Sequence, residues 1–74
     1  MSMSEPESID IIHRLKNHIA IVVGYCELLI PEFEEGDRRR GDLLEVHKAS
    51  QEAMALIPEL ARRVREGDRA LRDE

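Results

Sequence analysis

The sequence predicts an all-α fold in which an antiparallel two-helix hairpin dimerises into a four-helix bundle. Two segments of the 74-residue chain repeat apolar residues at steps of three and four, the spacing of an amphipathic helix. Only 3% of the residues are aromatic, which favours helices over a packed sheet. A chain of this length forms one small domain, so we expect a single domain over residues 1–74.

The first helix is expected over about residues 5–33. Ser4 is a candidate cap for its start, and Pro6 falls in the first turn, where proline is tolerated. Pro31 disfavours helical backbone at Ile30, so the helix should end or kink there. The apolar stripe comprises Ile9, Ile12, Ile19, Val23, Cys26, Ile30 and Phe33, flanked by Leu15, Val22 and Leu29. A stripe of this breadth is typical of a helix with more than one packing neighbour.

A polar loop is expected over about residues 34–41 and a second helix over about residues 42–66. Asp42 is the candidate N-cap of that helix, and a start directly after Asp37 is the alternative. The apolar stripe comprises Leu43, Val46, Ser50, Ala53, Ile57, Leu60 and Val64, broadened by Met54 and Ala61.

Two residues should disturb the second helix. Pro58 lies inside the pattern, where it removes one backbone hydrogen bond and is expected to bend the helix. Gly67 is expected to cap the C-terminus, leaving a frayed tail over 67–74.

Both apolar stripes are wider than the single seam that a hairpin can bury. A second copy of the chain would cover the remainder in a four-helix bundle. We therefore expect a homodimer.

Composition excludes several classes of function. With 16 acidic and 11 basic residues, the chain lacks the basic surface of a nucleic-acid-binding protein. Cys26 is the single cysteine, which excludes an intrachain disulfide or a cysteine-rich zinc site and fits a reducing compartment. The longest apolar run, Ile19 to Cys26, is too short to cross a bilayer, and the N-terminus is acidic where a signal peptide is basic. We expect a cytoplasmic protein with no membrane segment and no nucleic-acid partner.

His13 is the candidate functional residue. On a helical projection, Asn17, Ala20, Gly24 and Glu27 lie within about 40° of His13. The apolar stripe is centred roughly 150° away from His13, so the imidazole should face water above a strip of small residues against which another protein could lie. On position alone, an ordinary surface histidine is the alternative. A zinc site is not expected, because His13 and His18 are not spaced to meet on one helix face, whereas His47 falls near the second stripe and should form an interface hydrogen bond.

Two stretches resemble the phosphoacceptor box of sensor histidine kinases: residues 13–19 (His-Arg-Leu-Lys-Asn-His-Ile) and 24–29 (Gly-Tyr-Cys-Glu-Leu-Leu). The second helix is similar to that of the same dimerisation and histidine phosphotransfer domain. The resemblance implies that His13 is phosphorylated, that Asn17 positions water for dephosphorylation of a response regulator, and that Lys16 supports the incoming phosphoryl group.

The chain departs from the family pattern at two positions. Arg14 stands where the commonest pattern has an acid that accepts the imidazole proton, although one related subfamily resembles this chain with His-Arg-aliphatic-Lys-Asn. His18 stands where the family usually has a proline, so the first helix should lack the usual kink.

The 74 residues contain no glycine-rich lid and no acidic nucleotide motif, so no autonomous kinase activity is expected. ATP and Mg²⁺ would act only through a separate ATP-binding kinase domain, and no cofactor is expected in this chain. Two contexts stay open, a piece of a longer kinase and a stand-alone relay or docking protein.

The expected function is a histidine phosphoacceptor and dimerisation module of two-component signal transduction. His13 would exchange phosphoryl groups with an aspartate of a response-regulator receiver domain, which would dock over Ala20, Gly24 and Glu27. One alternative is a degenerate bundle that binds or sequesters a response regulator or kinase without catalysis. Another is a plain dimerisation hairpin.

Overall fold

The structure is a computed structural model that describes the backbone of residues 5–72 and the side chains of residues 6–67. Helix α1 spans Glu5–Leu29, a short 3-10 helix η1 spans Ile30–Glu32, and helix α2 spans Arg38–Arg72. The described part contains no strand, so the predicted all-α class is confirmed. Ser4, the expected cap of the first helix, lies outside the described residues.

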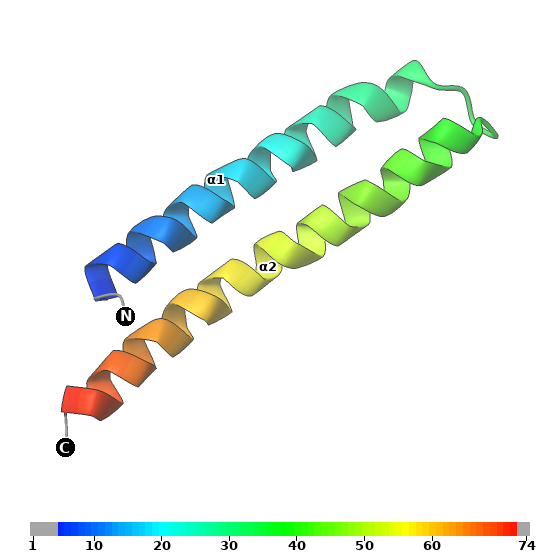
Figure 1. Cartoon of the computed structure of the whole chain (residues 1–74). Coiled ribbons are helices and arrows are strands. Elements are labelled where there is room, and N and C mark those ends of the chain that lie inside the picture. Colours follow the sequence, from blue (N-terminus) through cyan, green and yellow to red (C-terminus); the bar gives the residue numbers. More distant parts are fainter. Residues whose placement is uncertain (1–4, 73–74) are drawn as a thin grey trace.

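The two long helices lie side by side and run in opposite directions, with the start of α1 and the end of α2 at one end of the molecule and the loop at the other (Figure 1). The chain measures 58 × 18 × 15 Å and its radius of gyration is 17.1 Å. A compact chain of this length has a radius of gyration of about 11 Å. The single chain is therefore a rod with little interior. No helix of the described part is long and apolar enough to cross a membrane.

The seam between the helices is narrow. Among the side chains that the structure describes, only three hydrophobic ones are buried: Ile12 and Cys26 of α1 and Ile57 of α2, which are 5%, 3% and 7% exposed. All three belong to the predicted apolar stripes. Burial of Cys26 agrees with its expected place in the core.

Helix α1 is shorter than the expected range of about 5–33 and ends where Pro31 predicts. Its last residue is Leu29, and Pro31 occupies the first turn of η1, where its missing N–H costs no hydrogen bond. The backbone N–H of Phe33 then donates to the carbonyl oxygen of Ile30 at 3.2 Å. Gly36 follows with a φ of 91°, in the left-handed region that favours glycine. These residues reverse the chain direction within one short loop.

Of the two starts considered for the second helix, the one at Asp42 is wrong and the one directly after Asp37 is confirmed. Helix α2 begins at Arg38, so the loop covers residues 33–37 instead of 34–41. The cause is Asp37, whose Oδ1 accepts the backbone N–H of Arg39 at 2.9 Å, the bond expected of an N-cap aspartate. Hydrogen bonds from Arg39 also hold the pKa of Asp37 below its usual value.

The predicted C-terminal cap at Gly67 is also wrong. Helix α2 continues through Gly67 to Arg72, so a frayed tail over 67–74 is not observed up to that residue, and residues 73–74 lie outside the described part. Arginine, alanine and leucine between 69 and 72 are good helix formers, which offsets the cost of one glycine. Pro58 lies inside α2 without ending it.

Candidate functional site

His13 is exposed on α1 and borders a groove between the two helices. We call this hollow the His13 groove. Its lining comprises Ile12, His13 and Lys16 of α1 with Met54, Ile57, Pro58 and Ala61 of α2. The imidazole is therefore accessible from solvent and has the second helix as a neighbouring wall. A protein that approaches His13 would meet both helices.

Lys16 lies in the same groove, one turn after His13, and its side chain is exposed. In the apolar spacing of the first helix, Lys16 occupies the one polar position. None of the seven lining residues is acidic. An ammonium group beside an imidazole in such a groove can stabilise an anionic group that arrives there.

Arg14 is separated from the His13 groove. Its side chain is exposed and borders a different hollow, beside Pro6 and Asp10. Neighbouring residues of a helix project about 100° apart, which accounts for the separation. The residue that departs from the family pattern thus lies outside the groove that His13 and Lys16 share.

The strip of small residues lies after His13 on α1. Asn17 and Ala20 are exposed and Gly24 is half-buried. A Cβ atom added at Gly24 would meet nothing within 4 Å, so no other described part of the chain fills this surface. The strip leaves room for a neighbouring molecule to approach the α1 backbone closely.

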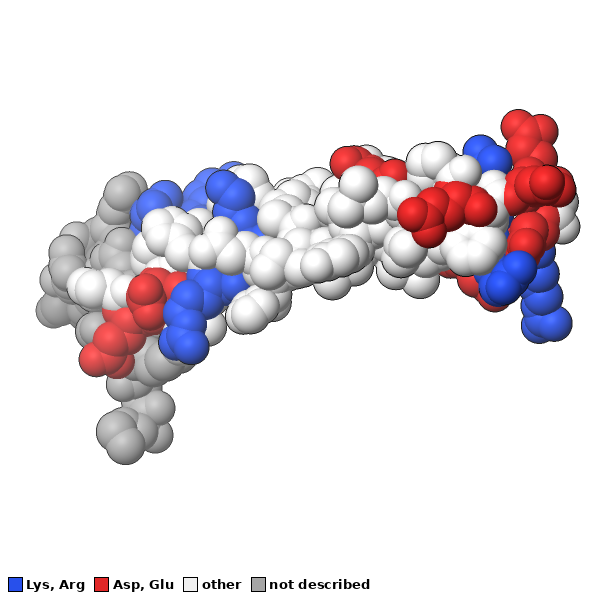
Figure 2. Space-filling model, turned by 90° about the horizontal axis from the view of Figure 1, so that it is seen from above, with Lys and Arg blue, Asp and Glu red and all other residues white. Residues whose placement is uncertain are grey.

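Sequence reasoning missed three exposed apolar residues beside this strip. Ile21, Tyr25 and Leu28, which we call the outer patch, are 54%, 62% and 67% exposed. On a helical projection they lie roughly opposite the side of α1 that is buried against α2. The sequence signal was residues 17–26, which contain no charged side chain. Seen from above, an uncharged section separates charged side chains at the terminal end from those at the loop end (Figure 2).

Glu27 contacts the second helix. Its Oε1 lies 3.3 Å from Nε2 of His47. The His47 side chain is only 19% exposed, which confirms the predicted interface hydrogen bond. Glu27 therefore links α1 to α2 in addition to lying at the end of the proposed docking surface.

Pro58 and Met54 also line the His13 groove, and a projection of α1 alone could not assign them to it. Proline has no N–H, so the carbonyl of Met54, four residues earlier, loses its usual helical donor. The groove thus includes the position at which the backbone hydrogen bonds of α2 are interrupted.

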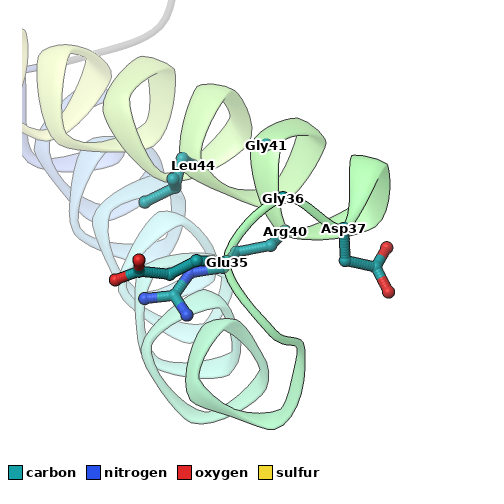
Figure 3. A pocket seen from close by; sticks show the side chains of 6 residues that line it. All are labelled: Glu35, Gly36, Asp37, Arg40, Gly41 and Leu44. Carbon is teal, nitrogen blue, oxygen red and sulfur yellow. The ribbon is translucent and has the colours of Figure 1, made fainter.

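A second hollow lies at the loop end, far along the rod from His13, and its lining is Glu35, Gly36, Asp37, Arg40, Gly41 and Leu44 (Figure 3). Two of its charged residues, Arg40 and Asp37, already have partners. Arg40 donates to the carbonyl oxygen of Phe33 at 3.0 Å, and Asp37 pairs with Arg39 at 2.8 Å. The Arg39 guanidinium lies 4.8 Å from the centre of the Phe33 ring. These contacts order the loop and give it a structural role.

Within residues 6–67, no group of three or more His, Cys, Asp or Glu side chains could hold a metal ion. His18 is exposed on α1.

No protein-family model, curated protein or solved structure matches this chain. The functional assignment therefore depends on the residues of the His13 groove and the surface beside it.

Proposed function

We propose that this chain is a histidine phosphoacceptor and dimerisation module of two-component signalling, in which His13 exchanges phosphoryl groups with an aspartate of a response-regulator receiver domain. The observation that carries the proposal is an exposed imidazole that shares a groove with Lys16 and with no acidic residue. An acidic lining would repel a phosphoryl group. The resemblance of residues 13–19 to a phosphoacceptor box supports the same assignment.

The reaction transfers one phosphoryl group between two proteins. A ring nitrogen of His13 attacks the phosphorus of the receiver's phosphoaspartate, the P–N bond forms, and the P–O bond to the aspartate breaks. The aspartate leaves as a carboxylate, and the imidazole proton passes to water. Lys16 offsets the negative charge on the transferring oxygens. The reverse reaction returns the group to the aspartate, and Asn17 would orient the water that removes it from the receiver.

The receiver domain would dock on α1 beyond His13. Ala20 and Gly24 let the partner backbone approach, and the exposed outer patch of Ile21, Tyr25 and Leu28 provides apolar area to bury. Interfaces of this kind concentrate their affinity in a few buried aromatic and aliphatic anchors. The position of the patch beside the strip supports docking close enough for transfer to His13.

A non-catalytic binding protein is the second candidate. The observation that favours it is the lack of any carboxylate among the lining residues of the His13 groove, so the lining offers no base for the imidazole proton. Such a protein would keep the docking surface and bind a receiver or a kinase without accepting phosphate.

The test uses the whole chain incubated with a phosphorylated receiver, or with a kinase core, ATP and Mg²⁺. We expect an acid-labile, alkali-stable phosphate label that is lost in His13→Ala. His18→Ala and His47→Ala are matched controls that should keep the label. A label that persists in His13→Ala would refute the phosphoacceptor assignment. Receiver binding without any label, equal in wild type and His13→Ala, would establish the non-catalytic alternative.

A further inference from the structure

We infer that Arg65 of α2 is a second phosphate-binding residue of the His13 groove, so that Lys16 and Arg65 hold the oxygens of one phosphoryl group from opposite walls. The inference rests on the proposed function and deepens it, because it names the residue of α2 that the transferring group would contact. Arg65 binds the group through charge and hydrogen bonds, and it makes no covalent bond and moves no proton.

Arg65 lies one helical turn from the level of His13. Two pairs of residues show how the helices align: Glu27 contacts His47, and His13 lines the same groove as Ala61. His13 precedes Glu27 by as many residues as Ala61 follows His47, which is the register of two antiparallel helices. Ala61 is therefore opposite His13, and Arg65 lies about 6 Å further along α2.

Arg65 also lies on the side of α2 that forms the groove wall. Met54, Pro58 and Ala61 follow one another at steps of four and three, and the next step of four leads to Arg65. On a projection at 100° per residue, the three lining residues lie about 40–100° to one side of the buried Ile57. Arg65 lies about 80° to the same side. It therefore continues the row that lines the groove.

The side chain of Arg65 can reach the groove. Side chains of a helix lean toward its N-terminus and cover the turn before their own Cα atom, so the side chain of Arg65 leans toward the level of His13. Ala61 lies on this path and has only a methyl group, which leaves room for a long side chain to pass.

The guanidinium of Arg65 is available for a ligand. Arg65 is exposed, and within the part of the chain whose side chains are described it has no ion pair or hydrogen bond. By contrast, Arg63 pairs with Glu59 at 3.1 Å. Arg65 therefore differs from its neighbour both in its side of the helix and in its free donors.

Two cations of different shape suit a phosphoryl group. Lys16 is a point charge, whereas an arginine presents a planar fork that donates two parallel hydrogen bonds to phosphate oxygens. During transfer the negative charge is spread over three oxygens, so a second cation has oxygens left to bind. With Lys16 on α1, Arg65 on α2 and no acidic residue in the lining, the group would be bound from both helices.

The first test is an NMR titration of the whole chain with inorganic phosphate at constant pH, with sodium chloride of equal ionic strength as the reference. We expect saturable shifts of the His13 ring and of Arg65 Nε–H with phosphate and not with chloride. Arg65→Ala should raise the dissociation constant, measured at His13, about tenfold.

Arg63→Ala is the matched control, because it removes the same charge from a different surface. Arg63 lies about 120° to the other side of Ile57 on the same projection and lines another hollow, with Leu56, Glu59 and Leu60. This variant should bind phosphate like wild type. Circular dichroism of each variant verifies that it is folded.

The second test is the rate of phosphoryl transfer to His13 at a saturating concentration of phosphorylated receiver, at which a loss of docking affinity does not enter. We expect Arg65→Ala to lower this rate about tenfold and Arg63→Ala to leave it unchanged. Arg65→Lys should recover part of the rate, because lysine keeps the charge but cannot form the paired hydrogen bonds.

Either equal phosphate affinities or equal transfer rates of Arg65→Ala and wild type would overturn the inference. Equal losses in Arg63→Ala and Arg65→Ala would also overturn it, since they would show a general effect of net charge. A wild-type chain that accepts no label from any receiver or kinase core refutes the proposed function instead. The phosphate titration then still decides whether Arg65 binds phosphate beside His13, because it contains no phosphoryl donor.

Discussion

The imidazole of His47 and the carboxylate of Glu27 join α2 to α1, with Nε2 and Oε1 3.3 Å apart. The two partners differ in environment, since the His47 side chain is 19% exposed and the Glu27 side chain is 61% exposed. The pair links the last turn of α1 to the first half of α2, and Glu27 also ends the proposed docking surface. A receiver on that surface would therefore lie next to a contact that holds the two helices together.

Removal of this contact should have a small, measurable effect on stability. We expect His47→Ala to lower the free energy of unfolding by about 0.5–1 kcal/mol, because one partner is largely in water and such pairs are weak. The measurement is urea unfolding at fixed protein concentration, which matters for a dimer. The control is His18→Ala, because His18 is exposed on α1, and this variant should unfold like wild type. Equal effects of the two variants would show that the contact does not stabilise the fold.

The helices themselves could be predicted because apolar spacing is a local property of the sequence. The same holds for the end of α1, where Pro31 restricts the residue before it. The start of α2 could not be decided in this way. Asp37 and Asp42 are both good capping residues, and the choice depends on which carboxylate reaches a free N–H once the loop has turned.

The candidate site could be predicted on one helix only. Projection of α1 alone places His13 in water and places Glu27 on the same side of α1 as His13. Which residues of α2 face His13 depends on the register between the helices, and the register depends on a loop that was predicted too long. Pro58 and Met54 were missed for that reason. Tyr25 was missed because the apolar stripe identifies only the buried side of α1, and Tyr25 lies on the opposite side of that helix.

The cap at Asp37 should make the stability of α2 sensitive to acid. Hydrogen bonds from Arg39 lower the pKa of Asp37 in the folded chain, so its contribution is complete above the unfolded pKa of about 3.9. The contribution is lost as the pH falls through the lower folded value. We expect Asp37→Ala to melt at a lower temperature than wild type at neutral pH and the difference to shrink in acid. Asp42→Ala should change the melting temperature less, and a larger effect at Asp42 would contradict the capping assignment.

We expect Pro58 to lower the free energy of unfolding and to raise the rate of phosphoryl transfer to His13. A proline inside a helix costs about 3 kcal/mol relative to alanine, so we expect Pro58→Ala to raise the free energy of unfolding by about 1–3 kcal/mol. Pro58 also lines the His13 groove. Alanine would restore the backbone donor to Met54 and change one wall of that groove, so the initial rate of phosphoryl transfer to His13 should fall. Urea unfolding and the transfer rate are measured on the same sample. A variant that is less stable than wild type would show that the proline ring is needed for packing.

Two glycine variants can distinguish an effect on stability from an effect on receiver binding. Gly24 of α1 and Gly41 of α2 both lie inside helices, and a Cβ added at either meets nothing within 4 Å. Alanine at each position should therefore raise the free energy of unfolding by about 0.5–1 kcal/mol. Only Gly24 belongs to the strip on which we propose that the receiver docks, where a methyl group would keep the two backbones apart. We expect Gly24→Ala to weaken receiver binding by about tenfold and Gly41→Ala to leave it unchanged, as measured by titration calorimetry. Equal receiver affinities of the two variants would remove the strip from the docking surface while leaving His13 as the phosphoacceptor.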